Sequence, residues 1–251
     1  MRIILLWLFV VSSFSAFAES SALRINDNDW PPYFFGGKEG TPKGIGKEIL
    51  HHCLVDSDYK FKFTFYPINR MHKYMEEGEL DINIYSYKPE RESFLVYGSE
   101  PLFVAGYRPI VRKNETRTID TIADFEPLLL GHLHGLSYSE PFYRYLMHRQ
   151  DVGQLVTASD SETLLTLLVH ERVDVFVSIS ETVLWQAKVM GIGGKIKVLD
   201  YDVKTSDYFV TISKSSHRIQ DKTKFLKQLD ACIRKAKQSG FYQSILDKYR
   251  L

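Results

Sequence analysis

The chain is poor in cysteine, in metal-binding motifs and in repeats. Its 251 residues contain two cysteines, Cys53 and Cys232, and no C-x-x-C pair or histidine-rich tract. This composition excludes a zinc-finger type of structural metal, so we predict no metal site. Each cysteine occupies an apolar position in a helix-like segment. A disulfide in an oxidising compartment and two buried thiols are both compatible with that pattern.

The chain also lacks an excess of charge of either sign. It has 32 basic and 31 acidic residues, and without the N-terminal segment that carries Arg2 the balance is 31 to 31. A protein with no net charge has no general attraction for nucleic acid or for anionic membranes. The sequence contains no Walker loop, dinucleotide fingerprint or nucleophile elbow. We therefore expect no nucleic-acid partner, no cofactor and no catalytic residues.

Long apolar runs are absent except at the N-terminus. There, Arg2 precedes an unbroken apolar run from Ile3 to Val11, and Ala16-Phe17-Ala18 has the A-x-A form of a secretory cleavage site. The run is too short for a comfortable membrane span, and no later segment approaches the roughly 18 apolar residues that a span needs. We predict that residues 1–18 are a signal peptide cleaved near Ala18, and that the mature chain is exported and soluble.

The first part of the mature chain alternates strands with helices. Apolar residues alternate in Phe61–Tyr66, as in a strand, and the helix before Gly78 ends at a residue type that often ends helices. The order β-α-β-α-β favours a sheet covered by helices. The predicted elements are strand Leu23–Asn26, a helix from Gly44, strand Phe61–Tyr66, helix Asn69–Glu77 and a strand that ends near Ser86.

The second part repeats this order and predicts a second α/β lobe. Two such modules, followed by further strands and helices, suggest that a ligand binds in a cleft between two lobes. The predicted elements are a short helix Asp120–Phe125, strand Leu128–Leu133, helix Pro141–Met147, strand Leu155–Ser159, a helix opened by a capping box at Ser159–Glu162 and running through Leu168, strand Val173–Ile179, a helix capped by Ser180 and ending at Gly191, strands Lys195–Tyr201 and Asp207–Ser213, and helices Ile219–Gln238 and Phe241–Tyr249.

The segment from Asp81 to Phe103 carries the first candidate for a binding site. A strand ends in a polar turn, Ser86–Glu90, followed by Arg91 and by an apolar run that ends at Ser99-Glu100-Pro101. Open α/β sheets bind ligands at the carboxyl ends of their strands. The guanidinium of Arg91 could grip a carboxylate with two hydrogen bonds, and the Ser86 hydroxyl could assist. The alternative is a surface ion pair of Arg91 with Glu90 or Glu92.

Taken together, these segments resemble the bacterial extracellular solute-binding proteins of family 3 over essentially all of the mature chain. The segments that carry the resemblance are WPPY after the first strand, GIGKEIL, EGELD, the S-x-x-x-x-R spacing of Ser86 and Arg91, SEPLF, IADFEPLLLGHLHG, HERVDVFV and the ending SGFYQSILDKYRL. The resemblance implies an α/β fold, a two-lobed periplasmic-binding-protein clamshell of type II, each lobe a mixed sheet flanked by helices. Lobe 1 would comprise residues 22–108 and 203–251, and lobe 2 residues 109–202.

The resemblance also implies a function. We expect a monomeric periplasmic protein, not an enzyme, that captures a small polar, carboxylate-bearing, amino-acid-like solute for an ABC importer. Two alternatives stay open. The same clamshell could sense a ligand for a membrane partner, or it could be a dehydratase-like enzyme, for which Glu181 would be the acid.

The resemblance further assigns roles to individual residues. The residue matching Arg91 grips the ligand's carboxylate, the one matching Ser86 assists, and an aromatic near Trp30 packs on the ligand. The turn Gly135 to Ser137 would supply N–H and hydroxyl donors from lobe 2, a role that suits such turns. Tyr138 follows this turn and could reach the cleft, with a place in the core as the alternative.

Two positions depart from the family pattern. The aspartate that takes the ligand's ammonium falls at Ile179, and Glu181 could replace it only if the turn is shifted. The second aromatic falls at Ile68, with Arg70 close by. An unpaired buried charge costs several kcal/mol, so these departures favour an anion held by Arg91 and Arg70 over an α-amino acid. The alternatives are an exposed Arg70 and, for Glu181, a first-turn carboxylate favoured by the helix dipole.

Overall fold

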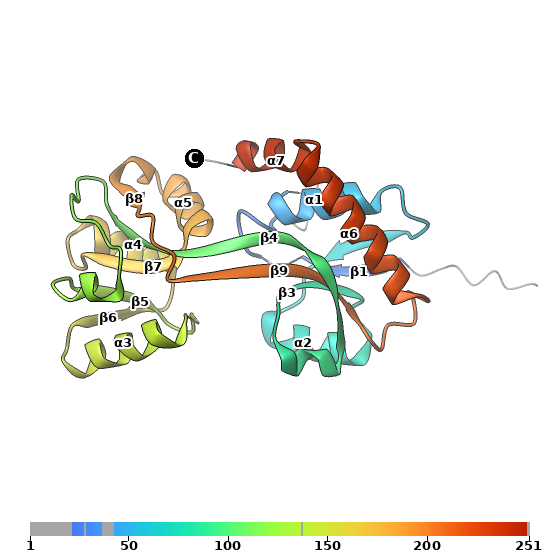
Figure 1. The fold of residues 1–251 in the computed structure, drawn as a ribbon, viewed down its shortest axis with the longest axis horizontal. Helices are drawn as coiled ribbons and strands as arrows, with labels where there is room; N and C mark the ends of the chain where they lie inside the picture. Colours follow the sequence, from blue (N-terminus) through green and yellow to red (C-terminus); the bar gives the residue numbers. More distant parts are fainter. Residues whose placement is uncertain (1–21, 28, 37–42, 137, 250–251) are drawn as a thin grey trace, which may run out of the picture.

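The computed structural model describes residues 22–27, 29–36, 43–136 and 138–249, so the predicted signal peptide lies outside the described residues. These residues form one nine-stranded mixed sheet with the strand order β2-β1-β3-β9-β4-β7-β5-β6, in which β8 pairs with β4. Helices gather around each end of the sheet, and two long strands join the ends, which gives the molecule two lobes (Figure 1).

The first lobe is built on parallel strands. Strands β2 (Phe61–Thr64), β1 (Leu23–Asn26) and β3 (Ile82–Ser86) lie side by side, and helices α1 (Ile45–Leu54), α6 (Lys222–Gln238) and α7 (Phe241–Tyr249) cover one face. Helix α2 (Ile68–Glu77) packs Met71 and Met75 against Tyr85 on the other face. It ends at Gly78, as predicted, where φ is 75° and an added Cβ would lie 2.4 Å from the Ser215 carbonyl oxygen.

The second lobe has the same architecture. Strand β5 (Leu130–Leu133) pairs in parallel with β6 (Leu155–Ala158) and β7 (Val175–Ile179). Helices α4 (Ser161–Val169) and α5 (Ser180–Val189) share a core with Phe176, and α3 (Glu140–Asp151) packs Phe142 and Leu146 in the other core. The short strand β8 (Ile196–Val198) follows a 3-10 helix, η3 (Gly193–Lys195). No helix within the described ranges is both long and apolar enough to cross a membrane.

Two long antiparallel strands connect the lobes (Figure 1). Strand β4 (Leu95–Arg112) pairs with β9 (Lys204–Ser213) over most of its length and then with β7 and β8. The chain passes into the second lobe along β4 and returns along β9. This architecture confirms the predicted two-lobed α/β fold. The predicted boundaries, 108/109 and 202/203, fall within β4 and just before β9, and they stay a prediction.

Strand β4 continues through Ser99-Glu100-Pro101, where the sequence predicted the end of an apolar run. The pairing of β4 with β9 shifts register on both sides of Pro101, so the proline is accommodated in an irregular stretch. The carboxylate of Asp230 in α6 accepts hydrogen bonds from the Ser99 and Glu100 N–H groups, at 2.9 and 3.2 Å, and from the Ser99 hydroxyl. The backbone N–H groups in this irregular stretch therefore still have a hydrogen-bond partner.

Several predicted helix starts were wrong by a few residues. The N-cap of α4 is Asp160, which accepts from the Thr163 N–H at 2.7 Å, and not Ser159. Ser180 is the first residue of α5, and its hydroxyl donates to the Gly106 carbonyl instead of capping the helix. Helix α6 begins at Lys222 after the N-cap Asp221, later than Ile219. Two further segments are 3-10 helices, η1 (Pro89–Ser93) and η2 (Ile122–Phe125).

The two cysteines form a disulfide. Cys53 at the end of α1 and Cys232 in α6 have their Cα atoms 5.7 Å apart. The structure therefore decides between the two alternatives that the sequence left open. The bond ties two helices that cover the same face of the first lobe.

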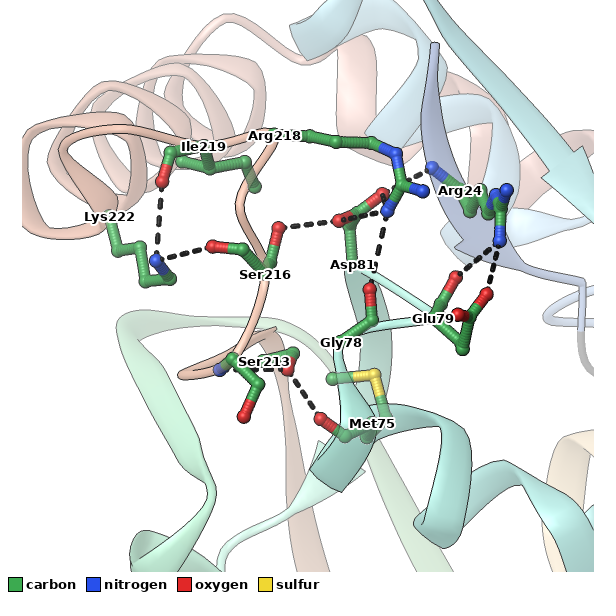
Figure 2. Close-up of polar contacts among 11 residues, drawn as sticks. Arg24, Met75, Gly78, Glu79, Asp81, Ser213, Ser216, Arg218, Ile219 and Lys222 are labelled. Carbon is green, nitrogen blue, oxygen red and sulfur yellow. Dashed lines mark hydrogen bonds and ion pairs between the residues drawn. The ribbon is translucent and has the colours of Figure 1, made fainter. Parts of the chain in front are cut away.

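A buried carboxylate organises the end of the first lobe where β3 begins (Figure 2). Asp81 is 0% exposed and accepts from the Arg24 N–H at 2.8 Å, from the Ser216 hydroxyl and from the Arg218 guanidinium at 3.3 Å. Arg24 also pairs with Glu79 at 2.7 Å. The contacts hold the connection between β9 and α6 against β1 and β3, at the opposite end of β3 from Ser86.

Candidate functional site

The carboxyl end of β3 presents a half-buried arginine. Arg91, in η1, donates from Nη1 to the Ser86 carbonyl oxygen at 3.1 Å, and its guanidinium carbon lies 4.7 Å from the centre of the Tyr85 ring. Among the described residues, no carboxylate forms an ion pair with Arg91. The alternative of a surface pair with Glu90 or Glu92 is therefore wrong, and Glu92 accepts from the Tyr87 hydroxyl instead.

A second aromatic layer supports Tyr85 from α2. The His72 ring stacks on Tyr85 at an interplanar angle of 17°, and His72 Nδ1 lies 3.2 Å from the Tyr85 hydroxyl. Burial raises the pKa of Tyr85 to about 12. Burial lowers the pKa of His72, and the positive charge of Arg91 lowers it further. Both rings are therefore neutral at neutral pH, and Arg91 is the cation of this stack.

Trp30 joins the first lobe to the second. Its ring lies 4.9 Å from that of Tyr208 on β9, and its Nε1 donates to the Thr182 hydroxyl of α5 at 3.0 Å. Beside it, the Tyr33 hydroxyl donates to the Glu181 carboxylate at 3.1 Å. Burial and the Glu181 charge hold the pKa of Tyr33 well above its usual value. Trp30 and Glu181 thus meet at one contact between the lobes.

Strand register places further residues on the same face of the sheet as Ser86. Ser86 pairs with Tyr208 across β3 and β9, while Tyr107 on β4 pairs with both Lys204 and Ile179. Cross-strand partners and alternate residues share a face, so all five side chains lie on one side of the sheet. The Tyr107 and Tyr208 hydroxyls are 3.5 Å apart, and Lys204 Nζ lies 5.2 Å from the centre of the Tyr107 ring.

A cavity of about 650 Å³ lies where β3 ends and β9 continues. Ser86 lines it from β3 and Lys204 from β9, together with Tyr97 of β4. The sequence did not predict Lys204, Tyr107, Tyr208, Tyr33 or Thr182 as part of a site. Their contacts join residues more than 90 positions apart in the sequence, for which the sequence carries no local signal.

The structure places the other predicted site residues elsewhere. Arg70 is exposed on α2. Tyr138 is buried in the second lobe, where its hydroxyl donates to the Val177 carbonyl at 3.1 Å and lies 3.3 Å from His132 Nδ1. Gly135 adopts a left-handed φ of 80° in the turn after β5 and lines a separate cavity of about 680 Å³ with His132 and Tyr138. Ser137 lies outside the described residues.

The structure therefore brings Ser86 together with Arg91, and Trp30 together with Glu181. It buries Ile179, at the predicted ammonium position, to 7% exposure beside Tyr107. Within the described part of the chain, no group of three or more His, Cys, Asp or Glu side chains is placed to hold a metal ion. The chemistry of the site is that of a cation, Arg91, held beside aromatic rings.

Comparison with protein families gives one match. The model of the bacterial extracellular solute-binding proteins, family 3, matches residues 25–251. No curated protein sequence matches the chain.

Solved structures share the fold. An ancestral cationic amino-acid solute-binding protein superposes with a TM-score of 0.70 at 18% identity, covering 91% of this chain and 95% of that one. The L-cystine solute receptor of Neisseria gonorrhoeae, unliganded and open, gives 0.70 at 17% identity, covering 91% of each chain. A histidine kinase sensor domain with similarity to periplasmic binding proteins gives 0.64 at 15% identity, covering 91% of this chain and 96% of that one. At these identities the likeness shows the fold alone.

Proposed function

Because this chain belongs to the bacterial extracellular solute-binding proteins, family 3, we propose that it captures a small polar, carboxylate-bearing solute between its lobes without chemistry of its own. The observation that carries the proposal is the setting of the Arg91 side chain. Its half-buried guanidinium stands at the carboxyl end of β3, held by the Ser86 carbonyl and the Tyr85 ring, with no carboxylate of the described chain paired to it. A guanidinium in that setting suits a ligand carboxylate, which it can bind with two hydrogen bonds.

We take the remaining parts of the site from the resemblance to the family. Ser86 assists Arg91, and Trp30 packs its ring on the solute. Gly135 and Ser137 supply donors from the second lobe, with Tyr138 behind them. Glu181 contacts the solute only if it exchanges its hydrogen bond with Tyr33, and Arg70 only if its exposed side chain turns inward.

In the cell, we place the mature monomer in the periplasm after cleavage near Ala18, where it would present the solute to an ABC importer. The similarity to a histidine kinase sensor domain favours one second candidate, a ligand-sensing protein with a membrane partner. Genes for a permease and an ATPase beside this one would support import. A neighbouring gene for a membrane sensor would support the second candidate.

A thermal-shift screen tests the capture of a carboxylate. The mature protein is refolded to remove any bound solute and screened against amino acids, dicarboxylates, other small acids and amines. A ligand at about 100 times its Kd should add roughly 2.7 kcal/mol, or several degrees. Arg91→Ala should abolish the shift, whereas Arg144→Ala, which changes an exposed arginine of α3, should keep it. An equal shift in wild type and Arg91→Ala, or no shift with any compound, contradicts the proposal.

A further inference from the structure

A titratable side chain shares its aromatic support with Arg91. His72 of α2 stacks on the Tyr85 ring, with 5.3 Å between the ring centres and 17° between the ring planes. The guanidinium carbon of Arg91 lies 4.7 Å from the centre of the same ring. The imidazole and the guanidinium are therefore no more than about 10 Å apart, which is the Debye length at 0.1 M salt. At that separation the charge of one group still acts on the other.

Three charged groups act on His72. Burial is the main cause that lowers the pKa of His72, and the charge of Arg91 is the next. Glu76 on α2 raises this pKa, and Lys88, which directly precedes η1, lowers it. Tyr85 of β3 adds no charge, because burial raises its own pKa to about 12. Arg91 is therefore the charge that affects His72 most, and the exposed imidazole can exchange a proton with solvent.

A carboxylate bound to Arg91 would reverse the effect of Arg91 on His72. The anion cancels the positive charge that disfavours the imidazolium, and its own negative charge favours it. The pKa of His72 is then higher in the bound protein than in the free protein. By linkage, binding becomes tighter as the pH falls through these two pKa values, and it is independent of His72 at a pH above both. Burial and Arg91 place the free value below the ordinary 6.5, so the effect belongs to mildly acidic pH.

We propose that His72 couples the binding of a carboxylate at Arg91 to the uptake of a proton from solvent, so that an anionic solute binds more tightly as the pH falls. The inference rests on the proposed function, because it adds a regulation by pH to the same site. His72 acts through Arg91 and needs no contact with the solute.

The first test needs no solute. An NMR titration of the eight histidines gives the pKa of each imidazole, and the signal of His72 is the one missing from His72→Phe. Arg91→Gln removes the guanidinium charge and should raise the pKa of His72, whereas Arg91→Lys keeps a positive charge and should leave it lowered. A pKa of His72 that is the same in wild type and Arg91→Gln overturns the inference.

The second test measures binding to the refolded mature chain by calorimetry at about pH 7.5 and about pH 5. The probes are acetate, succinate, L-alanine and L-glutamate, with any further acid that stabilises wild type in the thermal-shift screen. Both pH values lie above the usual carboxyl pKa of about 4, so the carboxylates stay ionised. From the higher to the lower pH, the Kd of wild type should fall about twofold more than that of His72→Phe, as two unit charges about 10 Å apart in water imply.

Two variants separate titration from folding and from other histidines. His72→Phe keeps an aromatic ring beside Tyr85 and removes the titrating group, so at about pH 7.5 it should bind like wild type. His148→Gln changes an exposed histidine of α3 and should keep the full pH dependence.

The two proposals fail in distinguishable ways. An equal pH dependence of Kd in wild type and His72→Phe overturns the inference and leaves the proposed function in place. If no probe binds wild type, the proposed function itself is overturned, and the inference with it.

Discussion

Asp81 is fully buried at the start of β3, so its carboxylate depends on protein partners in place of water (Figure 2). Asp81→Asn removes the negative charge that faces Arg218 and an acceptor for the Ser216 hydroxyl or the Arg24 N–H. We expect the free energy of unfolding to fall by about 2–3 kcal/mol, measured by urea denaturation.

The matched control is Asp151→Asn, at the exposed end of α3, which should change stability by less than about 0.5 kcal/mol. Equal stability of Asp81→Asn and wild type would show that the Asp81 charge makes no net contribution to the free energy of unfolding.

Glu115 predicts a pH dependence of stability. Arg117 donates to both of its carboxylate oxygens, at 2.9 and 2.7 Å, and this hydrogen bonding is the main cause that lowers the pKa of Glu115 from 4.5 to about 2. A carboxyl whose pKa is lower in the folded state stabilises the fold above its unfolded pKa and loses that contribution as the pH falls. Glu115→Gln should therefore lower Tm at about pH 7.

The Tm difference between wild type and Glu115→Gln should shrink as the pH falls from 4.5 towards about 2, as followed by scanning calorimetry. A difference of the same size at both ends of this range would mean that the pKa of Glu115 is not lowered by folding.

At the scale of elements, the disulfide between α1 and α6 closes a long loop, because its cysteines are 179 residues apart in sequence. Cross-links that close long loops restrict the unfolded chain, and their removal typically costs about 2–5 kcal/mol. The variant Cys53→Ala/Cys232→Ala should lose stability in this range by urea denaturation. A reductant should lower the stability of wild type to the same level and leave the variant unchanged. A wild type insensitive to reductant would argue against the bond.

The order of elements could be predicted from sequence because each helix and strand has a local signal. The alternation in Phe61–Thr64 and the glycine stop at Gly78 depend on residues a few positions apart. The length of β4 could not be predicted. Its passage through Pro101 depends on the carboxylate of Asp230, which lies 130 residues from Glu100. A bulge supported by such a distant side chain has no local signature.

The candidate site also has one part that could be predicted from sequence and one part that could not. Ser86 and Arg91 are five residues apart, so their meeting was predictable, although the contact is made by the Ser86 carbonyl and not by its hydroxyl. Lys204 enters the site through strand pairing with Tyr107, almost a hundred residues away. Arg70 and Tyr138 were predicted from their places in the sequence, close to Ile68 and after the Gly135–Ser137 turn, but Arg70 is exposed on α2 and Tyr138 is buried in the second lobe.

At the scale of the whole molecule, two side-chain hydrogen bonds connect the lobes. Trp30 donates to Thr182, and Tyr33 donates to Glu181. The double variant Tyr33→Phe/Thr182→Val removes both bonds. It should destabilise the closed arrangement of the lobes relative to an open one by about 2 kcal/mol, which shifts the equilibrium between them roughly 30-fold towards the open one. Small-angle X-ray scattering should then give a larger radius of gyration.

Tyr87→Phe provides the control, because the Tyr87 hydroxyl bonds to Glu92 within the first lobe. It should scatter like wild type. Scattering of the double variant that matches wild type would mean that the lobes are held by packing and not by these two bonds.

The most direct test of the account is a crystal structure of the mature wild-type chain with the solute that stabilises it most. We predict one solute molecule per chain, with a carboxylate within hydrogen-bond distance of the Arg91 guanidinium and the Trp30 ring against its body. A solute bound between the lobes that does not touch Arg91, or one bound outside them, would contradict the central claim.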